Sequence, residues 1–378
     1  MDNPDIIEEL EIKKKKKPLW RKVIGLVLKF GLAALIIGWI VRGNAGKIAD
    51  NLKDFNYWWL VPALVLYLSH MMICGWRWYM LLRVLKVNIS LWEALCLTMK
   101  AYFCSLVIPG GAIGGDLAKV GFVSMRAPKG TKVEGAFTIL IDRITGMIAL
   151  FVTAIVLTLI SIPLLLKVDM PELYKFLSDL FNLENTEDII HTFRILAIVA
   201  VLGLCLSGLA ACVVIFMHNQ FRKISIINTL MNWVDVKSKG TLTRVCDSVD
   251  IYRDKKMLLF NMTVVSVFFI HLNLGVVMFF LLKGLGVADI PVLAMLTAII
   301  LGNIAGLIPF TPSGIGFRDY TVIKILCAGG IIVDKAESSA ILFTALVLCA
   351  NLISGLFFFI NDGSAKRAQK ATESEGGA

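Results

Sequence analysis

Two short segments combine proline, glycine and charged residues in a way that could bind an anionic ligand. Residues 109–116 read PGGAIGGD, and residues 309–319 read PFTPSGIGFRD. Proline removes a backbone donor and glycine permits positive φ, so the backbone must leave helical geometry at both places. The free N–H groups of a helix that restarts there would suit a phosphate.

Both segments leave two interpretations open. Asp116 could cap the restarting helix, or it could belong to a binding site. Arg318 could hold a phosphate through its bidentate guanidinium, or it could pair with Asp319 and order the turn. Neither segment is a P-loop, because no Gly-Lys-Ser/Thr follows the glycines.

Further charged residues lie in apolar surroundings. Asp142 and Arg143 stand at the start of an apolar run. Adjacent residues do not face each other on a helix, so each needs a partner elsewhere. Arg77, between two tryptophans, could snorkel to the membrane interface or join a binding site. Lys100 should line a wet cavity or meet a carboxylate.

The composition requires a membrane to surround these residues. Of 378 residues, 57% are hydrophobic and 17% are charged, and the mean hydropathy is +0.78. Soluble domains carry about 25% charged residues, so a soluble enzyme or a disordered chain is excluded. The net charge is +10, and the basic residues lie between the apolar runs. This distribution indicates a signal for the orientation of the chain in the membrane rather than nucleic-acid binding. The eight cysteines lack metal-ligand spacing.

Six apolar runs are long enough to cross a bilayer as helices. They cover about 23–41, 57–82, 139–166, 193–217, 258–282 and 338–360. Two shorter segments, 91–108 and 291–308, each end in one of the proline- and glycine-rich breaks. The chain thus divides into a basic cytoplasmic segment (1–22), a single membrane domain (23–360) and a cytoplasmic tail expected to be disordered (361–378).

The sequence contains an internal repeat. Residues 81–114 resemble residues 281–314 at an offset of 200, with the proline and a glycine of each break in register. Upstream, His70 and His271 stand 201 residues apart. A chance likeness of leucine-rich stretches is the alternative, but shared Pro and Gly at breaks favour a duplication.

The charges of the loops decide between two topologies. If all eight apolar segments crossed, the basic loops 109–137 and 218–257 would lie outside and the acidic loop 167–192 inside. That arrangement violates the positive-inside rule. If 91–126 and 291–333 instead enter and return, every long loop obeys it. The predicted fold is therefore all-α, with six transmembrane helices and two re-entrant helical hairpins in an inverted repeat, and both termini are cytoplasmic.

The order and spacing of these motifs resemble the flippase-like family, also called the lysylphosphatidylglycerol synthase transmembrane-region family. The resemblance covers roughly residues 20–360 and includes residues 75–82 (GWRWYMLL) and the Pro-x-x-Pro-x-Gly-x-Gly element at 309–316. Lys119 stands where Arg is common in that family, and Asp319 where Glu is common. Larger relatives add an aminoacyltransferase domain, which we expect to be absent here.

The resemblance implies a protein of the cytoplasmic (inner) membrane that translocates or handles a polar phospho- or aminoacyl-lipid. Two alternatives remain: a non-catalytic membrane partner of a lipid or envelope-polymer synthase, and a membrane-embedded lipid-modifying enzyme. The expected partners are membrane lipids and a possible separate lipid or envelope synthase. No nucleic-acid partner is expected, and the sequence is compatible with an oligomer.

The motifs and the family resemblance together predict a set of substrate-binding residues. We expect no catalytic residues, cofactor or metal, because there is no nucleophile elbow and no HExxH motif. The set comprises Arg77, Lys100, Pro109, Gly110, Gly111, Gly114, Gly115, Asp116, Lys119, Asp142, Arg143, Pro309, Thr311, Pro312, Ser313, Gly314, Gly316, Arg318 and Asp319.

Overall fold

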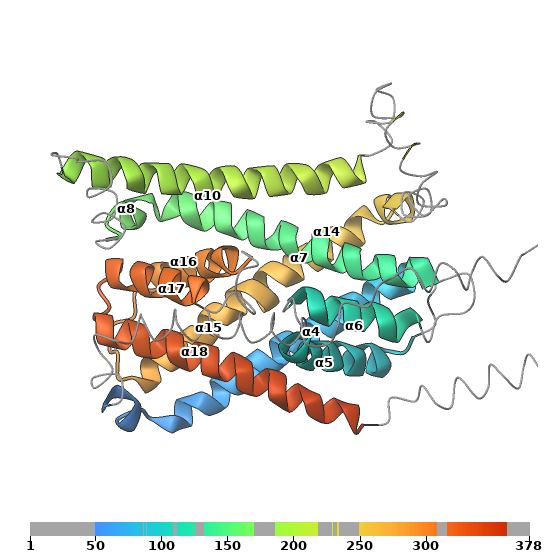
Figure 1. Ribbon diagram of the computed structural model, residues 1–378, viewed down its shortest axis with the longest axis horizontal. Coiled ribbons are helices and arrows are strands. Elements are labelled where there is room, and N and C mark those ends of the chain that lie inside the picture. Colours follow the sequence, from blue (N-terminus) through green and yellow to red (C-terminus); the bar gives the residue numbers. More distant parts are fainter. Residues whose placement is uncertain are drawn as a thin grey trace, which may run out of the picture.

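The computed structural model describes residues 50–85, 87, 89–108, 112–124, 132–169, 186–217, 229, 233, 249–307 and 316–360. Within these ranges all regular secondary structure is helical (Figure 1). The expected terminal segments, the first apolar run at 23–41, and most of the two proline-glycine breaks lie outside the described residues.

The helices follow the expected order. Their bounds are η1 Tyr57–Trp59, α4 Leu60–Val84, α5 Leu91–Val107, α6 Ala112–Ser124, α7 Lys132–Ile160, α8 Ile162–Leu165, α10 Thr186–Phe216, α14 Lys256–Val265, η2 Ser266–Leu272, α15 Asn273–Gly284, α16 Val292–Ala305, α17 Phe317–Ala328, α18 Val333–Ser354 and η4 Gly355–Phe358. The segment η2 is a π-helix that joins α14 to α15.

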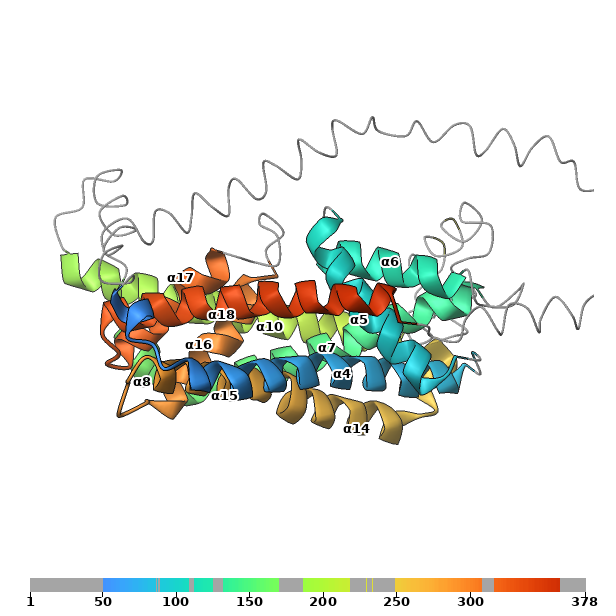
Figure 2. The same ribbon diagram turned by 90° about the horizontal axis from the view of Figure 1, so that it is seen from below.

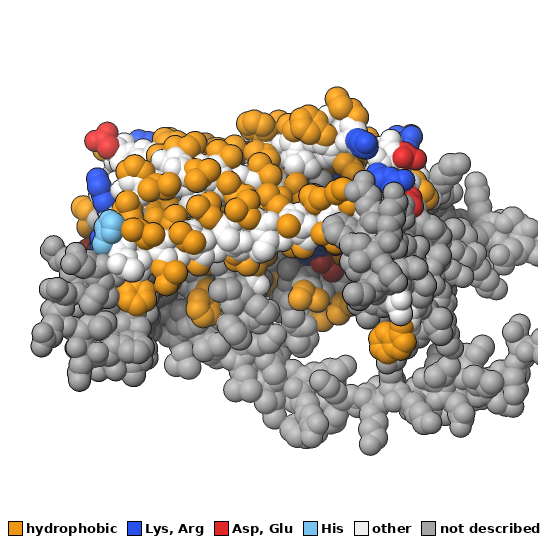
Figure 3. Space-filling view, turned by 90° about the horizontal axis from the view of Figure 1, so that it is seen from above, with side chains coloured by type: hydrophobic (Ala, Val, Ile, Leu, Met, Phe, Trp, Pro, Cys, Tyr) orange, Lys and Arg blue, Asp and Glu red, His pale blue; other side chains and the backbone are white. Residues whose placement is uncertain are grey.

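Five helical segments in the described part are long and apolar enough to cross a membrane. They are Tyr57–Val84, Gly135–Ile160, Ile190–Phe216, Lys256–Gly284 and Val333–Phe358. They coincide with five of the six expected runs, which confirms a multi-span helical membrane protein. Figure 3 shows hydrophobic side chains along the length of one face, with charged side chains gathered at its two ends.

The two shorter apolar segments form helical hairpins. At Gly115 of α6, an added Cβ would lie 2.7 Å from the Ala101 carbonyl oxygen of α5 and 3.2 Å from Ser105 Cβ. The α16–α17 pair packs equally closely, because Gly302 faces Arg318 and Gly329 faces Ala294. The first hairpin has Gly114 against Ile108 near the break, and Val123 in one cluster with Ala94 and Leu97 far from it. The second has its Gly302–Arg318 contact near the break and its Gly329–Ala294 contact far from it, so in both hairpins the two arms are antiparallel. The absence of a side chain at these glycines permits the close approach.

The helices α4 and α15 pack antiparallel across the centre of the molecule. The Asn56 N–H donates to the Gly284 carbonyl at 2.9 Å, and His70 Nδ1 lies 3.2 Å from the Ile270 carbonyl oxygen. Positions 70 and 270 are equivalent in the repeat, so the two halves meet at matching positions. Since equivalent helices run in opposite directions, the two halves of the repeat are oppositely oriented.

Matching turns support the repeat as a duplicated structure. After α4 the Val87 N–H donates to the Leu82 carbonyl at 3.3 Å, and after α15 the Val287 N–H donates to the Leu282 carbonyl at 3.1 Å. The α5–α6 pair lies towards one end of the long helices and the α16–α17 pair towards the other (Figures 1 and 2). The long helix α10 lies along one edge of the molecule, against α7.

The glycine contact in the first hairpin generates a stability prediction. We expect Gly115→Ala to destabilise the protein by about 1–3 kcal/mol, because the new methyl group would collide with backbone that cannot swing away. Thermal unfolding in detergent measures the effect.

Gly121 on the same helix supplies the control. A Cβ there would meet nothing within 4 Å, so Gly121→Ala should leave the unfolding temperature unchanged or raise it. Equal unfolding temperatures for the two variants would show that the α5–α6 approach is not tight.

Candidate functional site

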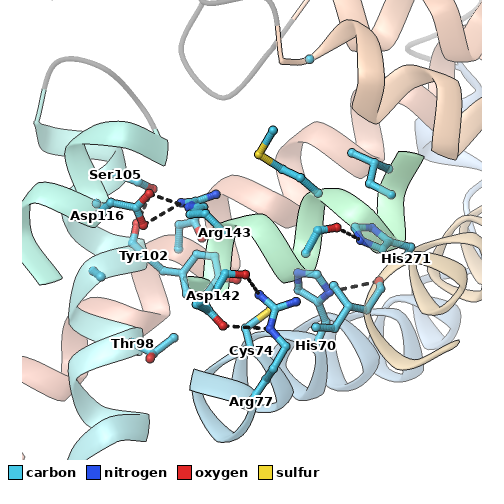
Figure 4. Close-up of a pocket in the computed structure, with 18 of the residues that line it drawn as sticks. His70, Cys74, Arg77, Thr98, Tyr102, Ser105, Asp116, Asp142, Arg143 and His271 are labelled. Atoms are coloured by element: carbon cyan, nitrogen blue, oxygen red, sulfur yellow. Dashed lines mark hydrogen bonds and ion pairs between the residues drawn. The ribbon is translucent and has the colours of Figure 1, made fainter. Parts of the chain in front are cut away.

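A cavity of about 350 Å³ lies between the two hairpins. The helices α4, α5, α6, α7, α17 and α18 line it, together with η2 and the residues just after α16 (Figure 4). Its wall contains both apolar and charged side chains. The described charged residues that line it are Arg77, Asp116, Lys119, Asp142, Arg143 and Arg318.

Arg77 joins three helices at the floor of this cavity. Its Nε donates to Asp142 Oδ1 of α7 at 2.8 Å, and its Nη1 donates to Ser266 Oγ of η2 at 2.8 Å. The side chains of Arg77 and Asp142 are only 7% and 10% exposed. Gly146, one turn after Asp142, makes room for the guanidinium, since a Cβ there would lie 3.1 Å from Nη1. Arg77 is therefore a buried structural cation and does not snorkel to the interface.

Arg143 binds the first hairpin. Its Nη2 donates to Asp116 Oδ1 at 2.8 Å and its Nε donates to Oδ2, so the pair is bidentate. The side chains of Arg143 and Asp116 are 46% and 28% exposed, so this bridge is accessible from the cavity. The neighbours Asp142 and Arg143 thus find partners on different elements, as the sequence requires.

At the second hairpin, Arg318 and Asp319 form a closed network. Asp319 Oδ2 accepts from the Gly316 N–H at 3.0 Å, which caps α17, while its Oδ1 accepts from Arg318 Nη2 at 3.0 Å. Thr344 of α18 contacts both groups: it accepts from Arg318 and donates to Asp319 Oδ1 at 2.9 Å. Gly316 has φ of 96°, which favours glycine. Arg318 therefore orders the turn and lines the cavity at once.

Lys119 has a different environment. Its Nζ lies 3.9 Å from the centroid of the Trp78 ring, whose Nε1 donates to Thr138 Oγ1 at 3.0 Å. Among the described residues no carboxylate lies within salt-bridge distance of this ammonium. Four cations (Arg77, Lys119, Arg143 and Arg318) thus accompany three carboxylates (Asp116, Asp142 and Asp319), which leaves one positive charge in excess.

The sequence-based set is brought together in part. The cavity contains Arg77, Gly115, Asp116, Lys119, Asp142, Arg143 and Arg318, and Asp319 lies directly behind Arg318. Gly114 packs against Ile108, and Gly316 opens α17. The remaining members lie outside the described residues: Pro109, Gly110, Gly111, Pro309, Thr311, Pro312, Ser313 and Gly314.

The structure adds three points to these expectations. Lys100 is buried outside the lining of this cavity, and its Nζ lies 6.0 Å from the centroid of the Phe358 ring. Asp116 does not cap α6, because that helix begins at Ala112. Asp142 and Arg143, at the start of their apolar run, lie almost three turns inside α7, because that helix begins at Lys132 and has about 3.6 residues per turn.

Several residues of the wall could not be predicted from the sequence. Tyr67, Cys74, Tyr102, Ser105 and Gly146 line the cavity, but no motif or periodicity singles them out. His70 and His271 also line it, and their spacing in the repeat was the one available signal. In the part of the chain that the structure describes, no group of His, Cys, Asp or Glu could hold a metal, and no disulfide joins the described cysteines.

The buried Arg77–Asp142 pair generates a second prediction. We expect Asp142→Asn to cost about 3–5 kcal/mol of stability, because it leaves the Arg77 charge buried without a carboxylate. The exposed Asp50–Lys53 pair is the control, and Asp50→Asn should cost less than about 1 kcal/mol. Unfolding of both variants in detergent checks this, and equal costs would contradict a desolvated Arg77.

Comparison with known proteins places the chain in a family. The family model described as Lysylphosphatidylglycerol synthase TM region matches residues 26–355, which include every helix that lines the cavity. A search of curated proteins found no match. Because the match extends over most of its length, the chain belongs to the family of the lysylphosphatidylglycerol synthase TM region.

Proposed function

We propose that this protein moves a polar lipid with an anionic phosphate head group between the leaflets of the cytoplasmic membrane. The observation that carries the proposal is the cavity between the two hairpins: when Asp319 directly behind Arg318 is counted, the described charged residues of its wall include one cation more than carboxylates. A charged wall inside a membrane protein is costly unless its charges are paired or meet a polar ligand. One phosphodiester would neutralise the excess.

Lys119 and Arg143 are the side chains best placed to bind that phosphate. Lys119 lies against an aromatic ring, and no described carboxylate is within salt-bridge distance of it. Arg143 is half-exposed to the cavity, and its planar fork suits phosphate as well as it suits Asp116. Arg77, in contrast, makes three hydrogen bonds to Asp142 and Ser266 and links α4, α7 and η2.

An alternating mechanism follows from an inverted repeat in the membrane. On this proposal there are six transmembrane helices, and the hairpins α5–α6 and α16–α17 enter from opposite sides without crossing. The antiparallel packing of α4 and α15 and the placing of the hairpins towards opposite ends of the long helices support it (Figure 1). Inverted repeats of this kind hold substrate near the midplane and open to each side in turn.

The proposal assigns transport and not catalysis to the membrane domain. Its expected environment is the inner membrane with both termini cytoplasmic, and the loop charges support that orientation. Appearance of a chemically altered lipid during the assay below would instead favour a membrane-embedded enzyme. Lipid movement that requires a co-purifying synthase would favour a partner subunit.

A reconstitution assay tests the lipid site. We expect purified protein in liposomes to move a fluorescent anionic phospholipid between leaflets, measured by dithionite quenching of the outer leaflet. Lys119→Gln should slow this movement about tenfold, the equivalent of losing one charge-assisted hydrogen bond. Arg318→Ala should slow it too, because the wall of the second hairpin loses its cation.

Lys53→Gln is the matched control. The Lys53 side chain is 76% exposed and pairs only with the nearby Asp50 among described residues, so this variant should move lipid at the wild-type rate. Equal rates for the wild type, Lys119→Gln and Arg318→Ala would remove the cavity from the transport path.

Cysteine labelling tests the hairpin topology. In a background without native cysteines, Arg83→Cys and Gly121→Cys flank the first hairpin, and Asp289→Cys and Ile332→Cys flank the second; all four positions are exposed. A membrane-impermeant maleimide should reach the first pair only from the cytoplasm and the second pair only from outside. Labelling of the two members of a pair from opposite sides would mean that the hairpin crosses.

A further inference from the structure

Two histidines line the cavity without taking part in its ion pairs. His70 of α4 has Nδ1 3.2 Å from the Ile270 carbonyl oxygen, and His271 of η2 has Nε2 3.1 Å from the Gly146 carbonyl oxygen (Figure 4). A carbonyl only accepts, so each of these nitrogens carries the hydrogen. In a neutral ring the other nitrogen, Nε2 of His70 or Nδ1 of His271, then holds a lone pair. Either ring can gain a proton without losing its hydrogen bond.

The two histidines lie where the two halves of the repeat meet. His70 bonds to residue 270, its own equivalent, so the axis that relates the two halves passes close to this contact. When two inverted halves exchange conformations, groups on that axis remain central and become reachable from each side in turn. His271 lies in the π-helix η2, a type of distortion that is frequent at functional sites.

The surroundings of the histidines are positively charged when the cavity holds no ligand. Of the described helices packed around η2, α16 has no ionisable side chain, and Lys256 and Lys283 lie near the ends of α14 and α15 that are remote from it. An added proton is therefore opposed by a net positive wall. The titratable groups that line the same cavity are Tyr67, Cys74 and Arg77 of α4, Tyr102 of α5, Asp116 and Lys119 of α6, Asp142 and Arg143 of α7, and Arg318 of α17.

We propose that His70 and His271 form a proton-binding site that takes up one proton when an anionic lipid head group enters the cavity. The inference rests on the proposed function. The phosphate cancels the excess charge of the wall, so the affinity for a proton rises, and by linkage a bound proton strengthens lipid binding. The proton comes from water and binds to Nε2 of His70 or Nδ1 of His271, and the first charge opposes a second.

The consequence is coupling of lipid movement to the proton gradient. A phosphodiester lipid carries one negative charge, so its passage with one proton moves no net charge across the membrane. A transmembrane pH difference would then drive the lipid towards the more alkaline side. Such coupling needs no ATP-binding domain.

The test uses the full-length protein in liposomes with an internal pH dye and the membrane potential clamped. The probe is a fluorescent phosphatidylglycerol, with a fluorescent phosphatidylcholine of zero net charge for comparison. We expect an imposed pH difference to speed movement of the anionic probe towards the alkaline side by severalfold, with the dye reporting proton entry. The zwitterionic probe should not produce this proton movement.

Variants separate the histidines from general effects. His70→Asn and His271→Gln place an amide N–H where each ring now donates, so the hydrogen bonds to the carbonyls can persist, and thermal unfolding checks that the fold does. The double variant should lose the response to the pH difference. His191→Gln is the control, because His191 is exposed on α10, outside the cavity, and should respond as wild type.

A second measurement needs only the wild-type protein. Adding a short-chain anionic phospholipid in weakly buffered detergent should raise the pH as protons are taken up. Lipid movement that ignores the pH difference, together with binding that takes up no proton, would overturn this inference and leave the proposed function intact. Failure to bind or move the anionic lipid at all would overturn both.

Discussion

The cost of burying charge in a low-dielectric interior is the constraint on which this structure depends. Arg77 is almost fully buried, and it is tolerated because Asp142 neutralises its charge and, with Ser266, accepts three of its hydrogen bonds. Those two partners belong to different helices, so satisfying one guanidinium fixes three segments relative to one another. The same requirement governs the second hairpin, where Asp319 both caps α17 and neutralises Arg318. The charges therefore pair only where these helices pack against one another.

The two ion pairs of α7 have unequal roles because their exposure differs. The Arg77–Asp142 pair in the wall is almost fully buried and holds the helices together, whereas the Arg143–Asp116 pair is more exposed. A phosphate can compete with a carboxylate for an exposed guanidinium at modest cost. It cannot displace a buried carboxylate without leaving that carboxylate buried and unpaired. The first hairpin, which carries Asp116, is thus the element whose contacts a ligand can most readily change.

Glycine determines how closely the polar wall can be built. Gly115 permits the arms of the first hairpin to touch, and Gly146 leaves space for Arg77 against the backbone of α7. A methyl group at either position would push a charged side chain or a hairpin arm away from its partner. In a membrane interior, where helices gain little from hydrophobic attraction, such small residues at interfaces provide the close packing that holds helices together.

The sequence by itself determined the membrane environment, the position of the helices and the repeat, because these depend on local composition and on an offset that can be read directly. Which charges would pair depended on tertiary structure: adjacent Asp142 and Arg143 had to find partners, but only the packing of α7 between α4 and α6 decided that these are Arg77 and Asp116. Lys100 shows the same limit. A charge in an apolar run must lie in a polar or paired environment, but the sequence does not say which residues provide it. Residues with ordinary neighbours in sequence, such as Gly146 and His271, enter the site only because distant helices meet there.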